Sequence, residues 1–274
     1  MVEWEKKMPN GNDKFKEFFE THQVFNSDEF QRHCAVSGYH ARNVLSKYVR
    51  HRHIRKLRNK LYTVLPEGSN PETFMPSPLL VAAKSSDDSV LSYSSALAYY
   101  GMARNLSFNY PYLSKKRGRR YRLGRDSFQP SLPPKKLKNA YEFGVTTQCL
   151  WKTPVRVVCK ERLLVDSLDR LNLTGGWEEI SNAFQYENTL DWKVLLEYLT
   201  ILNNPATSAR VGFFLDRFKS EMNVPDYVLD RIETMKPAHA EYFYRNYRKG
   251  HLNKKWNLFV TDEMDKLPEE DYVF

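Results

Sequence analysis

The sequence of 274 residues has little cysteine and no long apolar run. Its three cysteines, Cys34, Cys149 and Cys159, include no CxxC pair, which argues against a disulfide-rich secreted domain and against a common zinc site. No run approaches the roughly 18 to 20 apolar residues that cross a membrane, and residues Met1 to Gly11 lack the apolar core of a signal peptide. We therefore expect a cytoplasmic protein with free thiols and no membrane contact.

Acidic residues are absent from Phe30 to Pro66, although this segment carries nine Lys or Arg residues. A second basic segment, Lys115 to Lys138, carries ten bases and one acid, Asp126. Because the whole chain has a formal net charge of +9, the rest of the chain must be acidic overall. Two basic segments on an otherwise acidic chain mark surfaces for a partner such as nucleic acid.

The first basic segment overlies a regular apolar pattern, which indicates a folded surface. A short helix is expected from Asp28 to His33 with Ser27 as its N-cap, and a longer one from Gly38 with Ser37 as its N-cap. The longer helix has helical apolar spacing on one face at Ala41, Val44, Leu45, Tyr48 and Val49. The opposite face carries side chains able to reach base edges and phosphates, namely Tyr39, His40, Arg42, Asn43, Ser46, Lys47 and Arg50.

Two β-prone runs, Ile54 to Leu57 and Leu61 to Val64, follow and are separated by a basic turn. Upstream, Lys14 to Thr21 places three phenylalanines on one side of a further helix. This order predicts a winged helix-turn-helix domain over residues 1–66. The helix that begins at Gly38 would enter the major groove, and the hairpin, as the wing, would follow the DNA backbone or the minor groove. The residues expected to contact DNA are Ser37, Tyr39, His40, Arg42, Asn43, Ser46, Lys47, Arg50, Arg55, Lys56, Arg58, Asn59 and Lys60.

Residues 67–274 are expected to form a larger second domain, because Pro66 to Pro71 is rich in turn-forming residues. Short β-prone runs between Leu106 and Val158 suggest a small mixed or antiparallel sheet. The predicted fold class is α+β: an N-terminal winged helix-turn-helix followed by a larger α/β domain with several helices. These helices are expected at Pro78–Lys84, Ser94–Tyr100, Glu161–Leu171, Glu178–Phe184, Asp191–Leu202 and Ala206–Lys219.

The second basic segment has two competing interpretations. Tyr112 and Tyr121 interleave with its cations, as on a nucleic-acid surface where aromatic rings stack on bases and cations contact phosphates. A solvated hairpin whose charges discourage strand addition is an equally good interpretation. The cations concerned are Lys115, Lys116, Arg117, Arg119, Arg120 and Arg122.

No catalytic or metal-binding set is evident in the sequence. Arg162 and Asp166 are one helical turn apart, and a structural ion pair is preferred to a catalytic role. A nuclease would need a second carboxylate at useful spacing, and a nucleotidyltransferase would need Gly-Ser followed by Asp-x-Asp. His51 and His53, near Cys34, fit no common four-ligand zinc spacing. We expect no enzyme activity, no cofactor and no metal.

Several segments together resemble one protein family: Leu61-Tyr62, Ser77-Pro78, Ser94 to Gly101, Val157 to Arg170 with Gly175-Gly176, and Trp256 to Leu258. On these residues the chain resembles the AbiEi family, the antitoxins of type IV abortive-infection toxin–antitoxin systems, which are also transcriptional regulators. The resemblance covers roughly residues 12–260, and its most specific part is Glu161 to Arg170 followed by Gly175-Gly176.

The resemblance implies a cytoplasmic bacterial or archaeal protein encoded beside a nucleotidyltransferase toxin. It would repress its own operon at an inverted-repeat operator in double-stranded DNA, as a monomer in solution or a dimer on DNA. The second domain would counter the toxin without forming a stable complex, and Lys115 to Arg122 is then a candidate antitoxin surface or second nucleic-acid surface. The family usually has glycine directly before Leu61-Tyr62, where this chain has Lys60; Asn59 is expected to supply the left-handed conformation instead.

Two other function classes remain open. The chain could be an enzyme acting on nucleic acid, with the winged helix as its targeting module. It could instead be an RNA-binding or protein-interaction module. A salt-dependent preference for one duplex sequence over random duplex and RNA would distinguish the repressor from these alternatives.

Overall fold

The computed structural model describes residues 13–137, 139–244 and 250–265. The first residues of the predicted DNA-binding domain and Lys138 of the second basic segment lie outside this part. The chain divides into two compact units. The first comprises residues 1–91, 108–132 and 146–157, and the second comprises residues 92–107, 133–145 and 158–274.

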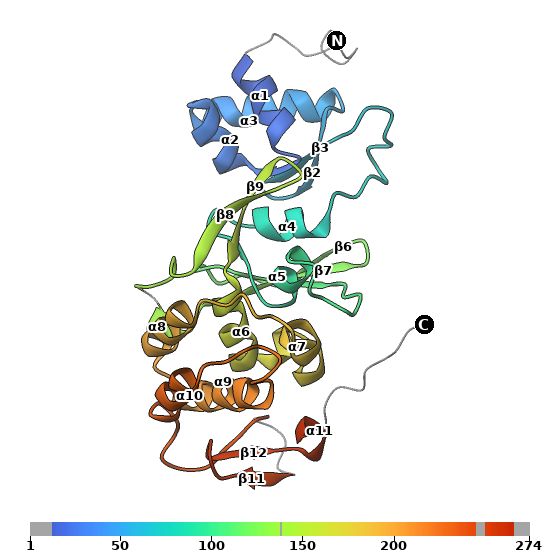
Figure 1. The fold of residues 1–274 in the computed structure, drawn as a ribbon. Helices are drawn as coiled ribbons and strands as arrows, with labels where there is room; N and C mark the ends of the chain where they lie inside the picture. The colour runs from blue at the N-terminus through green and yellow to red at the C-terminus, as the bar shows by residue number, and fades with distance from the viewer. Residues whose placement is uncertain (1–12, 138, 245–249, 266–274) are drawn as a thin grey trace. The chain divides into compact units, whose positions relative to one another are not determined.

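The first unit begins with three helices and a small sheet (Figure 1). These elements are α1 (Asp13–Thr21), β1 (Val24–Asn26), α2 (Ser27–Cys34), α3 (Gly38–Arg50), β2 (Ile54–Arg58) and β3 (Leu61–Val64). The three helices and the β2–β3 hairpin lie where the sequence pattern predicts them. The strand β1 was not predicted; it pairs antiparallel with β3 and gives the strand order β1-β3-β2.

The core of this region is aromatic. The side chains of Phe18 and Phe30 have no exposed surface, and their ring centroids lie 5.2 Å apart in an edge-to-face arrangement, which is a favourable geometry for aromatic pairs. Helix α3 adds Ala41, Leu45 and Tyr48 to the same cluster. The predicted apolar face of α3 is therefore confirmed, and its opposite face points to solvent.

One of the two predicted N-caps is wrong. Helix α2 is capped by Asn26, whose side-chain oxygen accepts a hydrogen bond of 2.8 Å from the backbone N–H of Glu29, and not by Ser27. Asparagine caps helices as well as serine does, and the extended backbone of Asn26 makes it the cap. Ser37 caps α3 as predicted, by accepting from the backbone N–H of His40 at 3.2 Å.

The left-handed residue of the turn between β2 and β3, the predicted wing, also differs from the prediction. Lys60, and not Asn59, has a positive φ of 63°. The carbonyl of Lys60 accepts a hydrogen bond of 2.8 Å from the backbone N–H of Ser27, and its ammonium lies 3.0 Å from the carboxylate of Asp28. These contacts to the start of α2 hold a conformation that costs a non-glycine residue about 1–2 kcal/mol.

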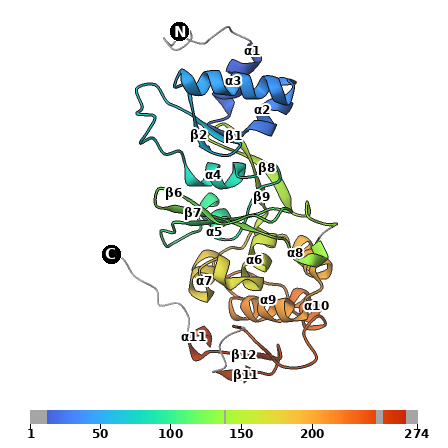
Figure 2. The ribbon, with the colours of Figure 1, turned by 180° about the vertical axis from the view of Figure 1, so that it is seen from behind.

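A mixed six-stranded sheet and helix α4 (Pro78–Lys84) complete the first unit. In Figures 1 and 2, which view the chain from opposite sides, α4 lies between the small sheet and the larger one. The strand order is β6-β7-β5-β4-β9-β8, with β5 parallel to β7 and antiparallel to β4. The strands are β4 (Val90–Leu91), β5 (Asn109–Leu113), β6 (Tyr121–Leu123), β7 (Asp126–Ser131), β8 (Val145–Leu150) and β9 (Thr153–Val158).

The first unit continues past residue 66, where the sequence analysis placed a domain boundary. Strand β1 packs against α4, and the backbone N–H of Gln23 donates to the hydroxyl of Thr153 at 3.0 Å. Lys84 of α4 forms an ion pair with Glu29 of α2. These contacts join segments far apart in the sequence, so the local composition around Pro66 does not reveal them.

The second unit is mainly helical. Its helices are α5 (Ser94–Tyr99), α6 (Lys160–Asp169), α7 (Trp177–Phe184), α8 (Trp192–Leu202), α9 (Pro205–Arg217), α10 (Asp226–Glu233) and α11 (Asp262–Asp265). Its three-stranded sheet has the order β10-β12-β11, from β10 (Glu241–Tyr242), β11 (His251–Asn253) and β12 (Leu258–Val260). The predicted helices are present, whereas α10 and α11 were not predicted. The chain is a mixed α/β protein, consistent with the predicted α+β class.

The three cysteines are free thiols: Cys34 is buried, Cys159 is partly buried and Cys149 is exposed. Burial raises the pKa of Cys34 and of Cys159 to about 11. Among the described residues, no three His, Cys, Asp or Glu side chains gather as a metal ion would require. Within the same ranges, no helix has both the length and the apolar character of a membrane span.

Candidate nucleic-acid interface

The exposed face of α3 carries the side chains predicted to contact DNA. Tyr39 has 74% of its surface exposed. Because Ala41, Leu45 and Tyr48 are packed in the core, this face cannot turn inward without exposing them. The other predicted residues of α3 and its cap are exposed too: Ser37, His40, Arg42, Asn43, Ser46, Lys47 and Arg50.

The polar groups on α3 divide by their chemistry. Arg42 and Asn43 lie in the N-terminal half of the helix, and their planar groups can make the paired hydrogen bonds that distinguish guanine and adenine. The guanidinium Nε of Arg42 lies 3.4 Å from the carbonyl of Gly38, a long hydrogen bond that DNA could replace. Lys47 and Arg50 lie nearer the C-terminus and are exposed, which suits contacts to phosphates.

Two of the predicted wing cations are held by the protein itself. The Nη1 of Arg55 donates a hydrogen bond of 2.7 Å to the carbonyl of Phe74. The guanidinium carbon of Arg58 lies 3.9 Å from the ring centroid of Tyr121, the first residue of β6. This is a cation–π contact, and it joins the end of β2 to the larger sheet.

The remaining wing residues differ in their surroundings. Lys60 is paired with Asp28. Partial burial acts to raise the pKa of Asp28, but Lys60, with smaller contributions from Asp87 and Arg32, outweighs it and lowers that pKa. Asn59 is exposed in the turn. Lys56 is exposed and forms no hydrogen bond or ion pair within the described residues. Among the predicted wing cations, Lys56 is therefore the best placed for a phosphate.

The cations of the second basic segment are exposed on the β5–β6 connection and on β6: Lys115, Lys116, Arg117, Arg119, Arg120 and Arg122. Lys116 lies 3.5 Å from Asp87, and Arg120 is hydrogen-bonded to Gln129. Tyr112, one of the two aromatic residues predicted to interleave with these cations, is only 3% exposed. Its ring therefore cannot stack on a base beside them.

The start of this connection is fixed by Asp88. Its carboxylate accepts hydrogen bonds from the backbone N–H of Lys115 at 2.6 Å and from the hydroxyl of Ser114 at 2.8 Å. Burial acts to raise the pKa of Asp88, but these hydrogen bonds outweigh it and the pKa is lowered. The carboxylate therefore stays ionised near neutral pH and orders the first residues of the basic connection.

A polar cluster lies between α1, α2 and α4 in the first unit. The ring of His22 stacks on Phe18 with centroids 4.1 Å apart, and its Nε2 lies 3.6 Å from a carboxylate oxygen of Glu29. The same oxygen of Glu29 contacts the ammonium of Lys84. Burial lowers the pKa of His22, and Glu29 only partly opposes this. The cluster fixes α2 on α4.

The segment around Arg162 and Asp166 is buried and has a structural role. Arg162 and Asp166 are 0% and 1% exposed, and Nε of Arg162 lies 3.2 Å from the Asp166 carboxylate. The guanidinium also donates to the carbonyls of Tyr141 and Phe143, and the hydroxyl of Tyr198 donates to Asp166 at 2.6 Å. Burial acts to lower the pKa of Arg162, but Asp166, Tyr198 and Tyr93 together outweigh it and raise that pKa. The predicted structural ion pair is confirmed.

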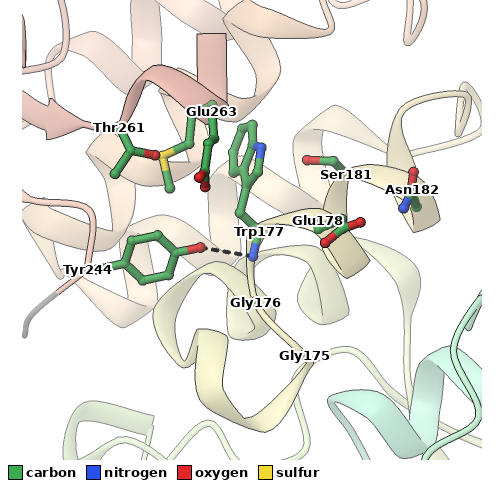
Figure 3. A pocket seen from close by; sticks show the side chains of 10 residues that line it. Gly175, Gly176, Trp177, Glu178, Ser181, Asn182, Tyr244, Thr261 and Glu263 are labelled. Atoms are coloured by element: carbon green, nitrogen blue, oxygen red, sulfur yellow. Dashed lines mark hydrogen bonds between the residues drawn. The ribbon is translucent and has the colours of Figure 1, made fainter. Parts of the chain in front are cut away.

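A cavity of about 380 Å³ lies at the start of α7, beside Gly175 and Gly176. Figure 3 shows the hydroxyl of Tyr244 pointing to the backbone N–H of Trp177, which donates to it at 3.3 Å. Both glycines have positive φ angles, 108° and 94°, that residues with a side chain rarely adopt. Within the described part of the chain, the lining includes Glu178 and Glu263 but no Lys or Arg.

Comparisons with known proteins give a similarity of fold. No protein-family model matches the sequence, and no curated protein matches it either. Among solved structures, the chain is similar to the structure described as "Crystal structure of RV2827C protein from Mycobacterium tuberculosis". The TM-score is 0.53 and the sequence identity is 12%, over 92% of this chain and 91% of that one. At this identity the similarity concerns the fold alone.

Proposed function

We propose that the chain is a sequence-specific DNA-binding protein that represses transcription, and that its first helices and small sheet act as a winged helix-turn-helix. The exposed polar face of α3 is the observation that carries this proposal. Its residues are held outward by a buried apolar face, and the preceding α2 and following β2–β3 hairpin have the order of such a domain. In this arrangement α3 is the recognition helix.

The side chains of α3 and the wing then have separate tasks. Arg42 and Asn43 read base edges in the major groove, where bidentate contacts discriminate between base pairs. Lys47, Arg50 and Lys56 contact phosphates, which supply affinity and fix the register without reading sequence. All five side chains are exposed, as either kind of contact requires.

The resemblance to the AbiEi family extends the proposal. The chain would be a cytoplasmic autoregulator that binds an inverted repeat upstream of its own operon, with one copy of α3 on each half-site. Two copies would meet on the DNA, because each chain offers one recognition helix. Residues 67–274 would counter a nucleotidyltransferase toxin encoded beside this chain, without a stable complex between the two proteins.

A promoter reporter tests the repressor function. The chain is expressed with a reporter gene under its own upstream DNA, and Asn43→Ala is compared with Gln148→Ala, an exposed residue on β8. We expect repression from the wild type and from Gln148→Ala, and a loss of repression from Asn43→Ala. Full repression by Asn43→Ala and by Arg42→Ala would contradict the assignment of α3.

A growth assay tests the antitoxin function. The neighbouring nucleotidyltransferase is induced with or without this chain, each under an unrelated promoter. Rescue of growth by both the wild type and Asn43→Ala is the expected result, because toxin neutralisation is assigned to residues 67–274. Continued toxicity with a well-expressed wild-type chain would remove the antitoxin function and leave the repressor.

A further inference from the structure

The wing is poor in cations that are available to DNA. Arg55 is bound to the Phe74 carbonyl, Arg58 lies on the Tyr121 ring, and Lys60 is paired with Asp28. Each of these side chains already has a partner within the unit, and a phosphate would have to share it or displace it. Much of the positive charge that the sequence assigns to the wing therefore also holds the hairpin in place.

The same contacts bring another basic segment to the end of the wing. Tyr121, which receives Arg58, is the first residue of β6, and its hydroxyl is 2.6 Å from that of Ser85. The connection of residues 114–120 leads directly into Tyr121. Lys116 in this connection lies 3.5 Å from Asp87. The β5–β6 connection thus enters the sheet at the point where the β2 end of the wing is attached.

This connection and β6 present cations that the protein does not use. The side chains of Arg117, Arg119 and Arg122 are exposed and have no hydrogen bond or ion pair within the described residues. No acid lies between Lys115 and Arg125. Since Asp88 holds the first residues of the connection, part of the ordering cost of binding is met before a partner arrives.

The chemistry of the segment favours a double-stranded partner. Single strands are bound by aromatic rings that stack on unpaired bases. Here Tyr112 is buried, the ring of Tyr121 is covered by Arg58 and stacked with Phe128, and the exposed Phe108 has the guanidinium of Arg125 4.6 Å from its ring centroid. Cations without free stacking rings suit the regularly spaced phosphates of a duplex.

We propose that residues 115–122 bind the phosphates of duplex DNA that flanks the sequence read by α3. In place of the wing, they would make the main contact with the DNA backbone beside that sequence. This inference rests on the proposed function. It predicts a binding site longer than a winged helix alone would cover. It also assigns Arg117, Arg119 and Arg122 to affinity and not to sequence preference.

The test compares two variants of equal charge in the full chain. One is Arg117→Ser/Arg119→Ser/Arg122→Ser, and the other removes three exposed cations of the second unit, Lys193→Ser/Arg231→Ser/Lys254→Ser. Fluorescence anisotropy measures the affinity for upstream duplex at several salt concentrations, with a scrambled duplex and a single-stranded RNA of equal length. Thermal unfolding checks that both variants fold, which we expect because the six side chains are exposed.

The expected result is specific to the first variant. Its slope of log affinity against log salt should be flatter than that of the wild type by about 2 to 3, since each lost phosphate contact contributes about 0.9. Its preference for upstream over scrambled duplex should remain. The control variant should keep the wild-type slope. A slope equal to the wild type in the first variant, or tighter binding of the wild type to the RNA, would overturn the inference.

These outcomes separate the inference from the proposed function. An unchanged slope together with a wild-type preference that depends on Asn43 would overturn only the role of residues 115–122. If the wild type has no preference for upstream DNA, the proposed repressor function fails. The slope on scrambled duplex still decides the inference in that case, because phosphate contacts do not depend on sequence.

Discussion

The side chain of Asp166 is bound on two sides, by the guanidinium of Arg162 and by the hydroxyl of Tyr198, at a position with almost no exposed surface. Removing its charge would leave the Arg162 guanidinium buried without its counter-ion. Breaking one partner of such a buried pair typically costs about 3–5 kcal/mol. This pair therefore matters to the stability of the second unit.

The first prediction concerns this pair. Asp166→Asn should lower the free energy of unfolding by about 3–5 kcal/mol in urea denaturation. Glu233→Gln breaks the more exposed pair between Glu233 and Lys236 and should cost less than about 1 kcal/mol. Equal, small effects of the two substitutions would mean that the Arg162–Asp166 pair does not hold this unit together.

The second prediction concerns pH. Burial lowers the pKa of His22 below its ordinary value of 6.5, with Lys84 and His33 adding to the shift and Glu29 opposing it. The unfolded chain therefore binds a proton that the folded chain excludes, so this contribution to stability is complete above pH 6.5 and is lost as pH falls toward the lowered pKa. Because buried His22 is uncharged in the folded chain and takes up a proton more readily when unfolded, we expect the first unit to be less stable in mild acid.

Thermal unfolding at pH 7.5 and pH 5.5 measures this effect. His22→Phe, which keeps a ring against Phe18, should lose less stability between the two pH values than the wild type does. The control is His239→Gln, an exposed histidine of the second unit, which should behave as the wild type. A wild-type loss that His22→Phe leaves unchanged would assign the pH dependence to other groups.

At the scale of elements, α3 is where sequence and structure agree most closely. The spacing of Ala41, Leu45 and Tyr48 determines which face is buried, so the opposite face could be predicted without any tertiary information. The third prediction follows: Arg42→Ala or Asn43→Ala should reduce the preference for the operator over scrambled duplex by about 1–3 kcal/mol. Competition binding measures it, and an unchanged preference in both variants would exclude α3 as the reading element.

The wing shows what the sequence could not reveal. The local sequence pattern predicts that Arg58 is a free cation. Its partner Tyr121 belongs to another strand, which only the fold brings near. Lys60 is left-handed because its carbonyl is bound by Ser27, whereas residue preference alone favours Asn59. Strand β1 has only three residues, too few for a recognisable period, and depends on its pairing with β3. Each difference comes from a tertiary contact.

The fourth prediction separates two lysines of the wing. Lys56→Ala should weaken binding to all duplexes alike and flatten the salt slope by about 1. Lys60→Ala should affect DNA binding less, because Lys60 is already paired with Asp28, and should cost at most about 1 kcal/mol of stability. Anisotropy titrations and urea denaturation measure the two effects. A larger loss of affinity in Lys60→Ala would show that the wing opens on DNA.

At the scale of the whole chain, the positive charge is concentrated. The acid-free segment from Phe30 to Pro66 and the exposed cations from Lys115 to Arg122 belong to the first unit, although the sequence analysis placed them in different domains. Composition showed the two basic segments, and the fold brings them into one unit. A protein with charge arranged in this way should bind DNA with a strong dependence on salt.

The central claim is sequence-specific DNA binding, and a gel-shift titration tests it most directly. The full chain is titrated into its own upstream DNA and into scrambled duplex of equal length and composition, at two salt concentrations. We predict a strong preference for the upstream DNA that survives the higher salt, with two successive shifted bands as two copies occupy an inverted repeat. Equal binding to both duplexes, lost alike at the higher salt, would contradict the account and leave only a non-specific basic surface.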